Sequence, residues 1–289
     1  MSLESHRLEI GGLKLHYQRV GSGPPLLLVH GLLGGSFCWR QNLAALSQRH
    51  TVFAVDLPGS GLSDAPPDTD CGMQSQVERL SGFMRELQLK EVSVMGCSYG
   101  GAVALRLAAR ESLASPSRIR ALVLVAPANP WSEFGQKRIR LLSTPLGGTL
   151  LRMAFPFSGP VHAVGLRRMY GDPTRVTPAT RKGYVANIVR PARAQNALSV
   201  LRHWSADMET LRSLIPTVQV PTLLITGGRD RAVDPRSCKI LKEHLSDGEQ
   251  VVFPELGHLP FEEAPKQFNQ LVLEFLERSG PAVCQTIAG

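Results

Sequence analysis

The chain has 289 residues, of which 43% are hydrophobic and 19% are charged, enough for one large core or for a core with a smaller lid. Its formal net charge is +8, but no run of about five basic residues is present, so we expect no nucleic-acid partner. The N-terminus is polar and no apolar run approaches the ~18 residues of a membrane helix, so we expect a cytoplasmic protein without a membrane span.

Short apolar runs alternate with longer segments of helical spacing, a pattern typical of βαβ units around a mostly parallel sheet. Residues 13–19 alternate apolar and polar side chains and predict a half-exposed strand near a sheet edge. Continuous apolar runs predict buried strands at 25–29, 51–55, 91–95, 119–125 and 222–226, with a further strand at 250–253. Apolar residues at helical spacing predict helices at 38–48, 73–87, 99–110, 236–244 and 265–278.

One interval breaks this alternation, because about 90 residues separate two consecutive buried strands, far more than an ordinary connection. Short helices broken by Pro and Gly are predicted there at 134–142, 146–155, 160–170, 178–190 and 194–203. We therefore predict a core domain formed by 1–128 and 216–289, and a helical cap at 129–215 inserted between two core strands.

The predicted cap is basic and contains conspicuous apolar residues. Between Trp131 and Ser205 there are 12 Lys or Arg residues and two acidic ones, Glu133 and Asp172. This charge predicts either a solvated outer face or a surface that attracts an acidic or anionic-interface substrate. Seven apolar side chains predict either ordinary cap core or the wall of an acyl pocket: Leu146, Leu151, Met153, Phe155, Phe157, Leu166 and Met169.

The motif Gly-Cys-Ser-Tyr-Gly at 96–100 lies between a predicted buried strand and a predicted helix. A serine in such a strand–turn–helix elbow is held out above the sheet, where it can act as a nucleophile. The glycines leave room for close backbone packing, and the positive helix end favours negative charge nearby. We predict that Ser98 is a nucleophile; the alternative is a serine that only caps the helix.

A serine nucleophile needs a base and an acid that orients it. His258 follows the strand predicted at 250–253 and precedes the last helix, so it can reach the strand ends, and we predict it as the base. Asp230 lies in the turn after the strand 222–226 and is our choice for the acid. Asp234 is the rival carboxylate, although its place before Pro235 suits a helix cap.

Two backbone N–H groups are candidates for binding a negatively charged oxygen, an oxyanion hole. One belongs to Tyr99, directly after the nucleophile, and the other to Leu32 in the glycine-rich loop after the strand 25–29. We expect His30 and Gly31, in the same loop, to contact the substrate. A flexible glycine turn is the alternative interpretation of this loop.

Five motifs in order make the chain similar to the α/β-hydrolase family, in its cap-bearing subgroup. They are LLLVHGLLG at 26–34, FAVDLPGSGLSD at 53–64, GCSYGG at 96–101, PTLLITGGRDRAVDP at 221–235 and LGHLPFEEAP at 256–265. The resemblance spans about Leu8 to Leu276. It implies a mostly parallel eight-stranded sheet with helices on both faces and an inserted helical cap.

The resemblance also bears on the reaction. Related epoxide hydrolases and haloalkane dehalogenases carry an aspartate where this chain has Ser98, which argues against those two reactions here. We predict a carboxylesterase or lipase-like serine hydrolase that cleaves esters of small to medium acyl chain through an acyl-enzyme. The partner is a small-molecule ester, and we expect no cofactor and no metal, since the five cysteines include no Cys-x-x-Cys pair.

Two other functions remain open. Carbon–carbon bond hydrolases of ring-cleavage products are similar in fold, triad and cap, but tend to carry Ser-Met-Gly-Gly at the elbow and Trp after the catalytic His. Here Tyr99 and Leu259 occupy those two places. A ligand-sensing protein on the same fold is the second alternative. The oligomeric state, monomer or homodimer, is also left open.

Overall fold

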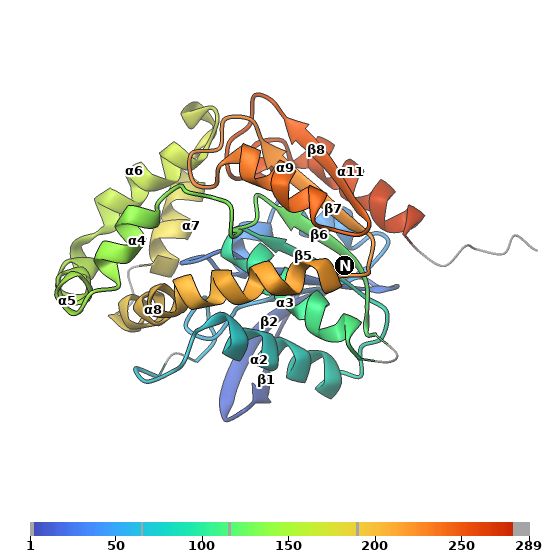
Figure 1. Cartoon of the computed structure of the whole chain (residues 1–289), viewed down its shortest axis with the longest axis horizontal. Helices are drawn as coiled ribbons and strands as arrows, with labels where there is room; N and C mark the ends of the chain where they lie inside the picture. The colour runs from blue at the N-terminus through green and yellow to red at the C-terminus, as the bar shows by residue number, and fades with distance from the viewer. Residues whose placement is uncertain (1–2, 65, 115–116, 189–190, 280–289) are drawn as a thin grey trace, which may run out of the picture.

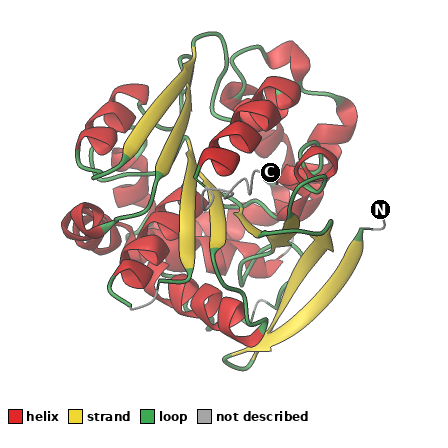
Figure 2. Cartoon of the chain, turned by 90° about the vertical axis from the view of Figure 1, so that its right-hand side faces the viewer, coloured by secondary structure: helices red, strands yellow, loops and turns green. Residues whose placement is uncertain are grey.

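A single eight-stranded sheet forms the centre of the molecule (Figures 1 and 2). The computed structural model describes residues 3–64, 66–114, 117–188 and 191–279. The strand order is β1-β2-β4-β3-β5-β6-β7-β8; β1 and β2 pair antiparallel, and the strands from β4 to β8 run parallel. The strands are β1 Glu4–Ile10, β2 Leu13–Val20, β3 Pro25–Val29, β4 Thr51–Val55, β5 Val92–Cys97, β6 Ile119–Val125, β7 Thr222–Gly227 and β8 Gly248–Phe253.

The predicted fold, an α/β-hydrolase sheet of eight mostly parallel strands, is confirmed. One strand was missed: β1 Glu4–Ile10 pairs with β2 through a turn at Gly11 and Gly12, both at positive φ. Most of its side chains are exposed and polar, because it lies at the sheet edge and packs on one face only. A strand of this kind gives no apolar run in the sequence.

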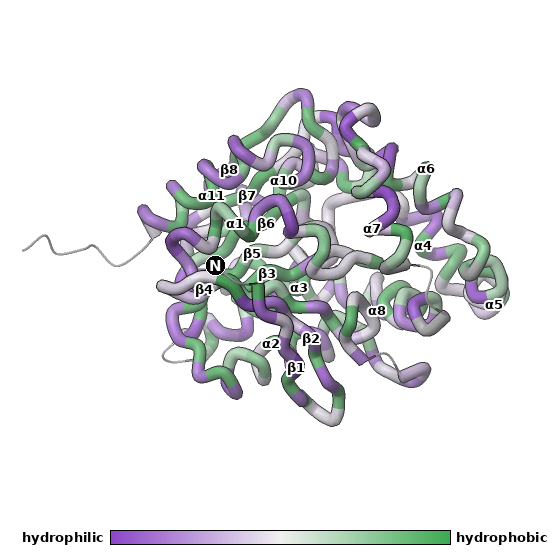
Figure 3. The backbone as a smooth tube through the Cα atoms, turned by 180° about the vertical axis from the view of Figure 1, so that it is seen from behind, coloured by the Kyte–Doolittle hydropathy of each residue, from purple (hydrophilic) through white to green (hydrophobic). Residues whose placement is uncertain are grey.

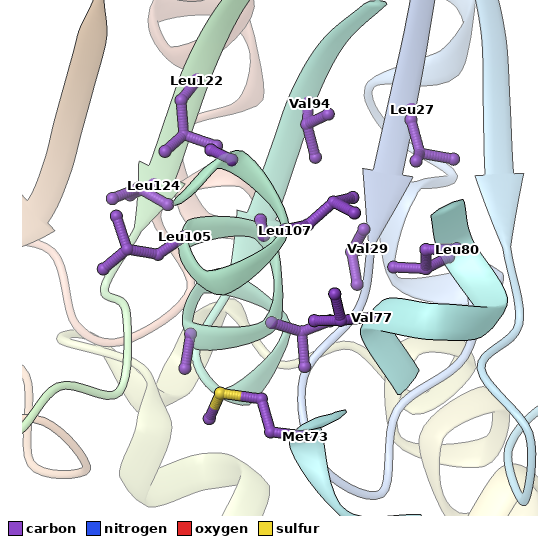
Figure 4. Close-up of a cluster of buried hydrophobic side chains, with 14 of the residues drawn as sticks. Leu27, Val29, Met73, Val77, Leu80, Val94, Leu105, Leu107, Leu122 and Leu124 are labelled. Atoms are coloured by element: carbon purple, nitrogen blue, oxygen red, sulfur yellow. The ribbon is translucent and has the colours of Figure 1, made fainter. Parts of the chain in front are cut away.

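Two apolar clusters cover the two faces of the sheet. Leu27 and Val29 of β3 enter one cluster, while Leu26 and Leu28 enter the other, because successive strand residues point to opposite faces. Figure 4 shows the first cluster, where the strands meet side chains of α2 and α3. Core helices on the two faces are α2 Met73–Glu86, α3 Tyr99–Ser112, α9 Pro235–Glu243, α10 Pro260–Glu263 and α11 Pro265–Arg278.

The helix predicted at 38–48 is wrong. A 3₁₀ helix, η1 Ser36–Trp39, is followed by a single helical turn, α1 Leu43–Leu46. Backbone hydrogen bonds in η1 span three residues instead of four; for example, the N–H of Cys38 donates to the carbonyl of Gly35. Asn42 then anchors the segment across the fold through its side-chain amide, which donates to Phe261 O and to Asn269 Oδ1. Apolar spacing does not reveal such anchors.

Between β6 and β7 the chain forms a series of helices, the helical insertion (136–214), at one end of the molecule in Figure 1. The last predicted helix, 194–203, is too short, because α8 runs to Leu214 and packs beside α3. Buried Asp207 interrupts its apolar spacing yet is paired with Arg106 at 2.8 Å. The insertion comprises α4 Gln136–Leu142, α5 Pro145–Ala154, η2 Phe155–Phe157, α6 Gly159–Met169, η3 Pro173–Arg175, α7 Pro178–Ile188 and α8 Pro191–Leu214, followed by η4 Ile215–Thr217.

The helix predicted at 178–190 corresponds to α7, and residues 189–190 lie outside the described ranges. The division into a core (1–128 and 216–289) and a cap (129–215) stays a prediction. Across the described residues, the structure contains no helix long and apolar enough to cross a membrane.

Candidate active site

Ser98 occupies the turn between β5 and α3. Its φ of 53° and ψ of −124° are strained for a residue with a Cβ, and such strain is found where a fold over-determines a functional position. Its N–H donates to Val125 O at 2.9 Å, and its carbonyl accepts from Gly101 and Ala128. The Ser98 side chain makes no capping hydrogen bond to the described helix α3, so the helix-cap alternative does not fit.

The backbone around Ser98 leaves no room for a side chain at Gly96 or Gly100. A Cβ on Gly96 would lie 2.3 Å from the carbonyl oxygen of Gly100, and a Cβ on Gly100 would lie 2.3 Å from that of His30. Both contacts are with backbone atoms, which cannot move aside without shifting the turn. The elbow therefore brings the β3 loop and the start of α3 close together around Ser98.

His258 and Asp230 form a buried pair. Nδ1 of His258 donates to Oδ2 of Asp230 at 2.7 Å, and each side chain is 2% exposed. The other carboxylate oxygen, Oδ1, accepts from the N–H groups of Ala232 and Val233. Burial disfavours the charged imidazole, but the charge of Asp230 and the hydrogen bond to it outweigh burial and raise the pKa of His258.

Asp234, the rival carboxylate, lies elsewhere. It is the N-cap of α9, where its side chain accepts from the N–H of Arg236 at 3.0 Å and pairs with the guanidinium of the same residue. Of the two predicted carboxylates, the structure places Asp230 on the imidazole.

Ser98 and His258 line one cavity of about 140 Å³ between the sheet and the helical insertion. Its wall is mainly apolar. Of the seven cap residues predicted as either cap core or acyl-pocket wall, Leu166 and Met169 line this cavity. Leu151 and Phe155 fit the cap-core alternative, and the other three fit neither. Leu151 and Phe155 pack into a separate small cluster, and Leu146, Met153 and Phe157 are exposed on the outer surface.

The predicted oxyanion donors are free to bind a ligand. Among the described residues, the backbone N–H groups of Leu32 and Tyr99 have no hydrogen-bond acceptor. Leu32 lines the cavity, and a Cβ placed on Gly31 would lie 3.1 Å from the Cβ of Ser98. The glycine-rich loop therefore lies directly against the serine.

His30 and Gly31, expected to contact the substrate, differ in position. Gly31 lines the cavity with Ser98. The ring of His30 is 1% exposed and engaged with backbone groups: its Nδ1 donates to Gly31 O, and its Nε2 accepts from the N–H of Leu57 at 3.0 Å. Burial lowers the pKa of His30, which keeps the ring in the neutral form that these two bonds need. His30 holds the loop in place.

His162 of α6 also lines the cavity, and sequence reasoning passed over it. Burial lowers its pKa, and its Nε2 has no hydrogen-bond partner within the described chain. His162, Leu166 and Met169 follow at helical spacing and all line the cavity. That spacing is the one sequence signal that points to His162.

Sequence reasoning also missed two adjacent acids, Glu262 and Glu263, which follow the loop that carries His258. Glu262 accepts from Arg40 at 2.6 and 2.7 Å and from the hydroxyl groups of Tyr170 and Tyr184. Glu263 accepts from the N–H groups of Gly257, next to His258, and Gly171. We call this pair the Glu262–Glu263 clamp, because it ties the helical insertion to the loop that carries His258.

Comparison with known proteins agrees with this geometry. The family model described as the alpha/beta hydrolase fold matches residues 24–265, so the chain belongs to the α/β hydrolases. The predicted family is thereby confirmed.

Three similar proteins show where the chain falls in this family. A pimeloyl-[acyl-carrier protein] methyl ester esterase of Nitrosomonas europaea is 30% identical, over 88% of this chain and 96% of that protein. A 2-hydroxy-6-oxo-6-(2'-aminophenyl)hexa-2,4-dienoic acid hydrolase of Metapseudomonas resinovorans is 27% identical, over 93% and 89%. Among solved structures, a bacterial membrane phospholipase A has a TM-score of 0.71 and 26% identity, over 96% of this chain and 86% of that one. Relatives of this kind support a hydrolytic enzyme.

Proposed function

We propose that this protein is a serine esterase that cleaves carboxylic esters of small to medium acyl chain. The observation that carries the proposal is the 2.7 Å Asp230–His258 hydrogen bond behind a cavity that His258 and Ser98 both line. The relatives include an enzyme named as a methyl ester esterase and one named as a phospholipase, which agrees with ester chemistry.

In the proposed reaction, Oγ of Ser98 attacks the ester carbonyl carbon while Nε2 of His258 takes the hydroxyl proton. Asp230 holds the proton on Nδ1 and stabilises the imidazolium that forms. The N–H groups of Leu32 and Tyr99 donate to the negatively charged oxygen. The C–O bond of the ester then breaks, His258 gives its proton to the departing alcohol, and water repeats the sequence on the acyl-enzyme to release the acid.

The cavity supports an assignment of the two halves of the substrate. We place the acyl chain in the apolar cavity of about 140 Å³, walled by Leu166, Met169 and Phe261. A wider cleft of about 730 Å³ also reaches Ser98, between α4 and α6, and is left for the alcohol. The acyl group is thereby limited in size, whereas the alcohol is not.

The test is hydrolysis of p-nitrophenyl esters from acetate to palmitate by wild type and Ser98→Ala. We expect turnover of short and medium esters by wild type and a loss of at least about 10³-fold in Ser98→Ala, with an unchanged circular dichroism spectrum. Ser75→Ala is the matched control, because that half-buried hydroxyl lies on α2 and, among the described residues, hydrogen-bonds to Asp70. Hydrolysis retained by Ser98→Ala would refute the mechanism.

The carbon–carbon bond hydrolase alternative is supported by the relative that acts on a dienoic acid. A folded wild type that is inert on every ester but turns over a dienone ring-fission compound would establish it in place of the esterase. Binding of ester without multiple turnover would instead point to the ligand-sensing alternative.

A further inference from the structure

Exposed apolar side chains are concentrated on one part of the molecule. Of the 14 large hydrophobic residues that are exposed in the described chain, nine lie between Phe134 and Met169. Monomeric proteins rarely expose apolar side chains in such density without a binding role. Six of the nine lie on the consecutive elements α5, η2 and α6, and we call them together the apolar face: Leu146, Leu150, Met153, Phe157, Val161 and Val164.

The apolar face is formed by projecting side chains. Leu146, Leu150 and Met153 recur at helical spacing on α5 and therefore share one side of that helix, with Phe157 next along the chain. Phe157 is 83% exposed, and Leu146 is 72% exposed. The opposite side of α5 carries Gly147 and Gly148, which are buried against the rest of the insertion. In Figure 3, α5 lies at the edge of the molecule with hydrophobic segments along it.

Basic side chains lie on the same helices and on the neighbouring helix α4. Arg140 and Arg152 lie on α4 and α5, and Arg167 and Arg168 end α6; all four are exposed. In the described part of the chain none of the four pairs with a carboxylate. No carboxylate of the described residues therefore compensates the charge of these four arginines.

We propose that the apolar face docks on the surface of an anionic lipid bilayer. Projecting Leu, Met and Phe side chains enter the boundary between headgroups and acyl chains, while the arginines contact lipid phosphates. A second copy of this chain would bring like charges together, which disfavours self-association through this face. A protein partner would need pockets shaped for each projecting side chain, whereas lipid accommodates them without a preformed shape.

The position of the wider cleft agrees with this inference. The cleft reaches from Ser98 to the surface between α4 and α6, and its walls include Val161 and Val164 of the apolar face together with Arg168. A molecule docked on this face therefore turns the opening of the cleft toward the lipid. The docking proposal does not depend on the proposed reaction, because binding is measured without turnover.

The test is co-sedimentation of the full chain with vesicles of phosphatidylcholine that contain phosphatidylglycerol, compared with phosphatidylcholine alone. We expect binding to the anionic vesicles only, and weaker binding as NaCl is added. The double variant Leu150→Ser/Phe157→Ser should bind the anionic vesicles with an affinity at least about tenfold lower than that of wild type. The matched control, Ile240→Ser/Val252→Ser, removes two exposed apolar side chains elsewhere and should bind like wild type.

Ser98→Ala should bind anionic vesicles like wild type, which separates docking from catalysis. The circular dichroism spectrum of Leu150→Ser/Phe157→Ser, compared with that of wild type, checks that this variant is folded. Equal binding to both vesicle types, or no binding to either, would overturn the proposal. A wild-type dimer that this double variant dissociates, or binding to a purified acidic protein but not to vesicles, would assign the face to a protein partner instead.

Discussion

The two aspartates after β7, only four residues apart, make opposite kinds of contact. Asp230 is buried and divides its two oxygens between the imidazole of His258 and two backbone N–H groups. Asp234 is a helix cap that shares its charge with the exposed guanidinium of Arg236. The pair therefore offers a test in which the same chemical change is made inside and outside the site.

We expect Asp230→Asn to lower kcat for a p-nitrophenyl ester by about 10³–10⁴-fold, because an amide neither fixes the imidazole tautomer nor stabilises its cation. The neutral ring is the base, so wild-type kcat/KM should rise with pH through the pKa of His258. Asp230 raises that pKa above the ordinary 6.5 against the effect of burial. The midpoint should therefore lie above 6.5 in wild type and fall in Asp230→Asn.

Asp234→Asn is the control for this pH profile. Asn is as good a helix cap as Asp, so we expect a loss of less than about 1 kcal/mol in unfolding free energy. The rate and the midpoint should both stay at the wild-type values. A midpoint that shifts in Asp234→Asn rather than in Asp230→Asn would contradict the placement of the acid.

Local sequence patterns identify some residues of the site and not others. Ser98 could be predicted because its motif, strand and helix are contiguous in the chain. His162 shares a helix face with Leu166 and Met169, but the spacing alone does not tell that this face of α6 packs over the cavity. Likewise, Glu262 meets Arg40 across 222 positions of sequence, a contact that no local pattern encodes.

The elements show the same dependence on context. β4 Thr51–Val55 and β6 Ile119–Val125 have the bounds predicted, because central parallel strands are buried on both faces and read as unbroken apolar runs. β1, exposed at the edge, has no such run. The prediction for α8 stopped early because buried Asp207 is satisfied by Arg106 of α3 and by the N–H of Met73, both distant in sequence.

The Glu262–Glu263 clamp joins elements that are far apart in the sequence, so its loss should lower the free energy of unfolding of the whole molecule. Glu262→Gln leaves Arg40 and two tyrosine hydroxyls around an uncharged side chain. We expect a loss of about 3 kcal/mol in unfolding free energy, measured by urea denaturation at neutral pH. The charge lost is buried, whereas that of an ion pair on the surface is screened by water.

Glu277→Gln gives the matched comparison. It removes the carboxylate of an ion pair with Arg49 in which both side chains are more than half exposed. We expect a loss of under about 1 kcal/mol. Equal losses in Glu262→Gln and Glu277→Gln would mean that the clamp contributes no more than a surface pair.

At the scale of the whole molecule, burial is unevenly divided. Helix α3 contains 11 buried residues, whereas α4 contains none, and α6 only Leu166. The C-terminal part of α8 belongs to the core, with Met208 and Leu211 in the cluster of the sheet. The helical insertion is therefore fixed mainly by α8 at its C-terminal end and by the Glu262–Glu263 clamp at its middle, near Tyr170 and Gly171.

This distribution predicts two levels of local stability, measurable by hydrogen exchange of the intact chain with peptide-level mass spectrometry. Backbone N–H groups of α4, α5 and α6 should exchange well before those of α2 and α3, because few apolar contacts oppose their local opening. The C-terminal half of α8 should be protected like α3, against which it packs. Early exchange confined to α4–α6 would support a cap that unfolds locally without the core, with its outer boundary inside α8 rather than at residue 215. Uniform protection of the insertion and the core would contradict the division into two domains, because both parts would then open only in global unfolding.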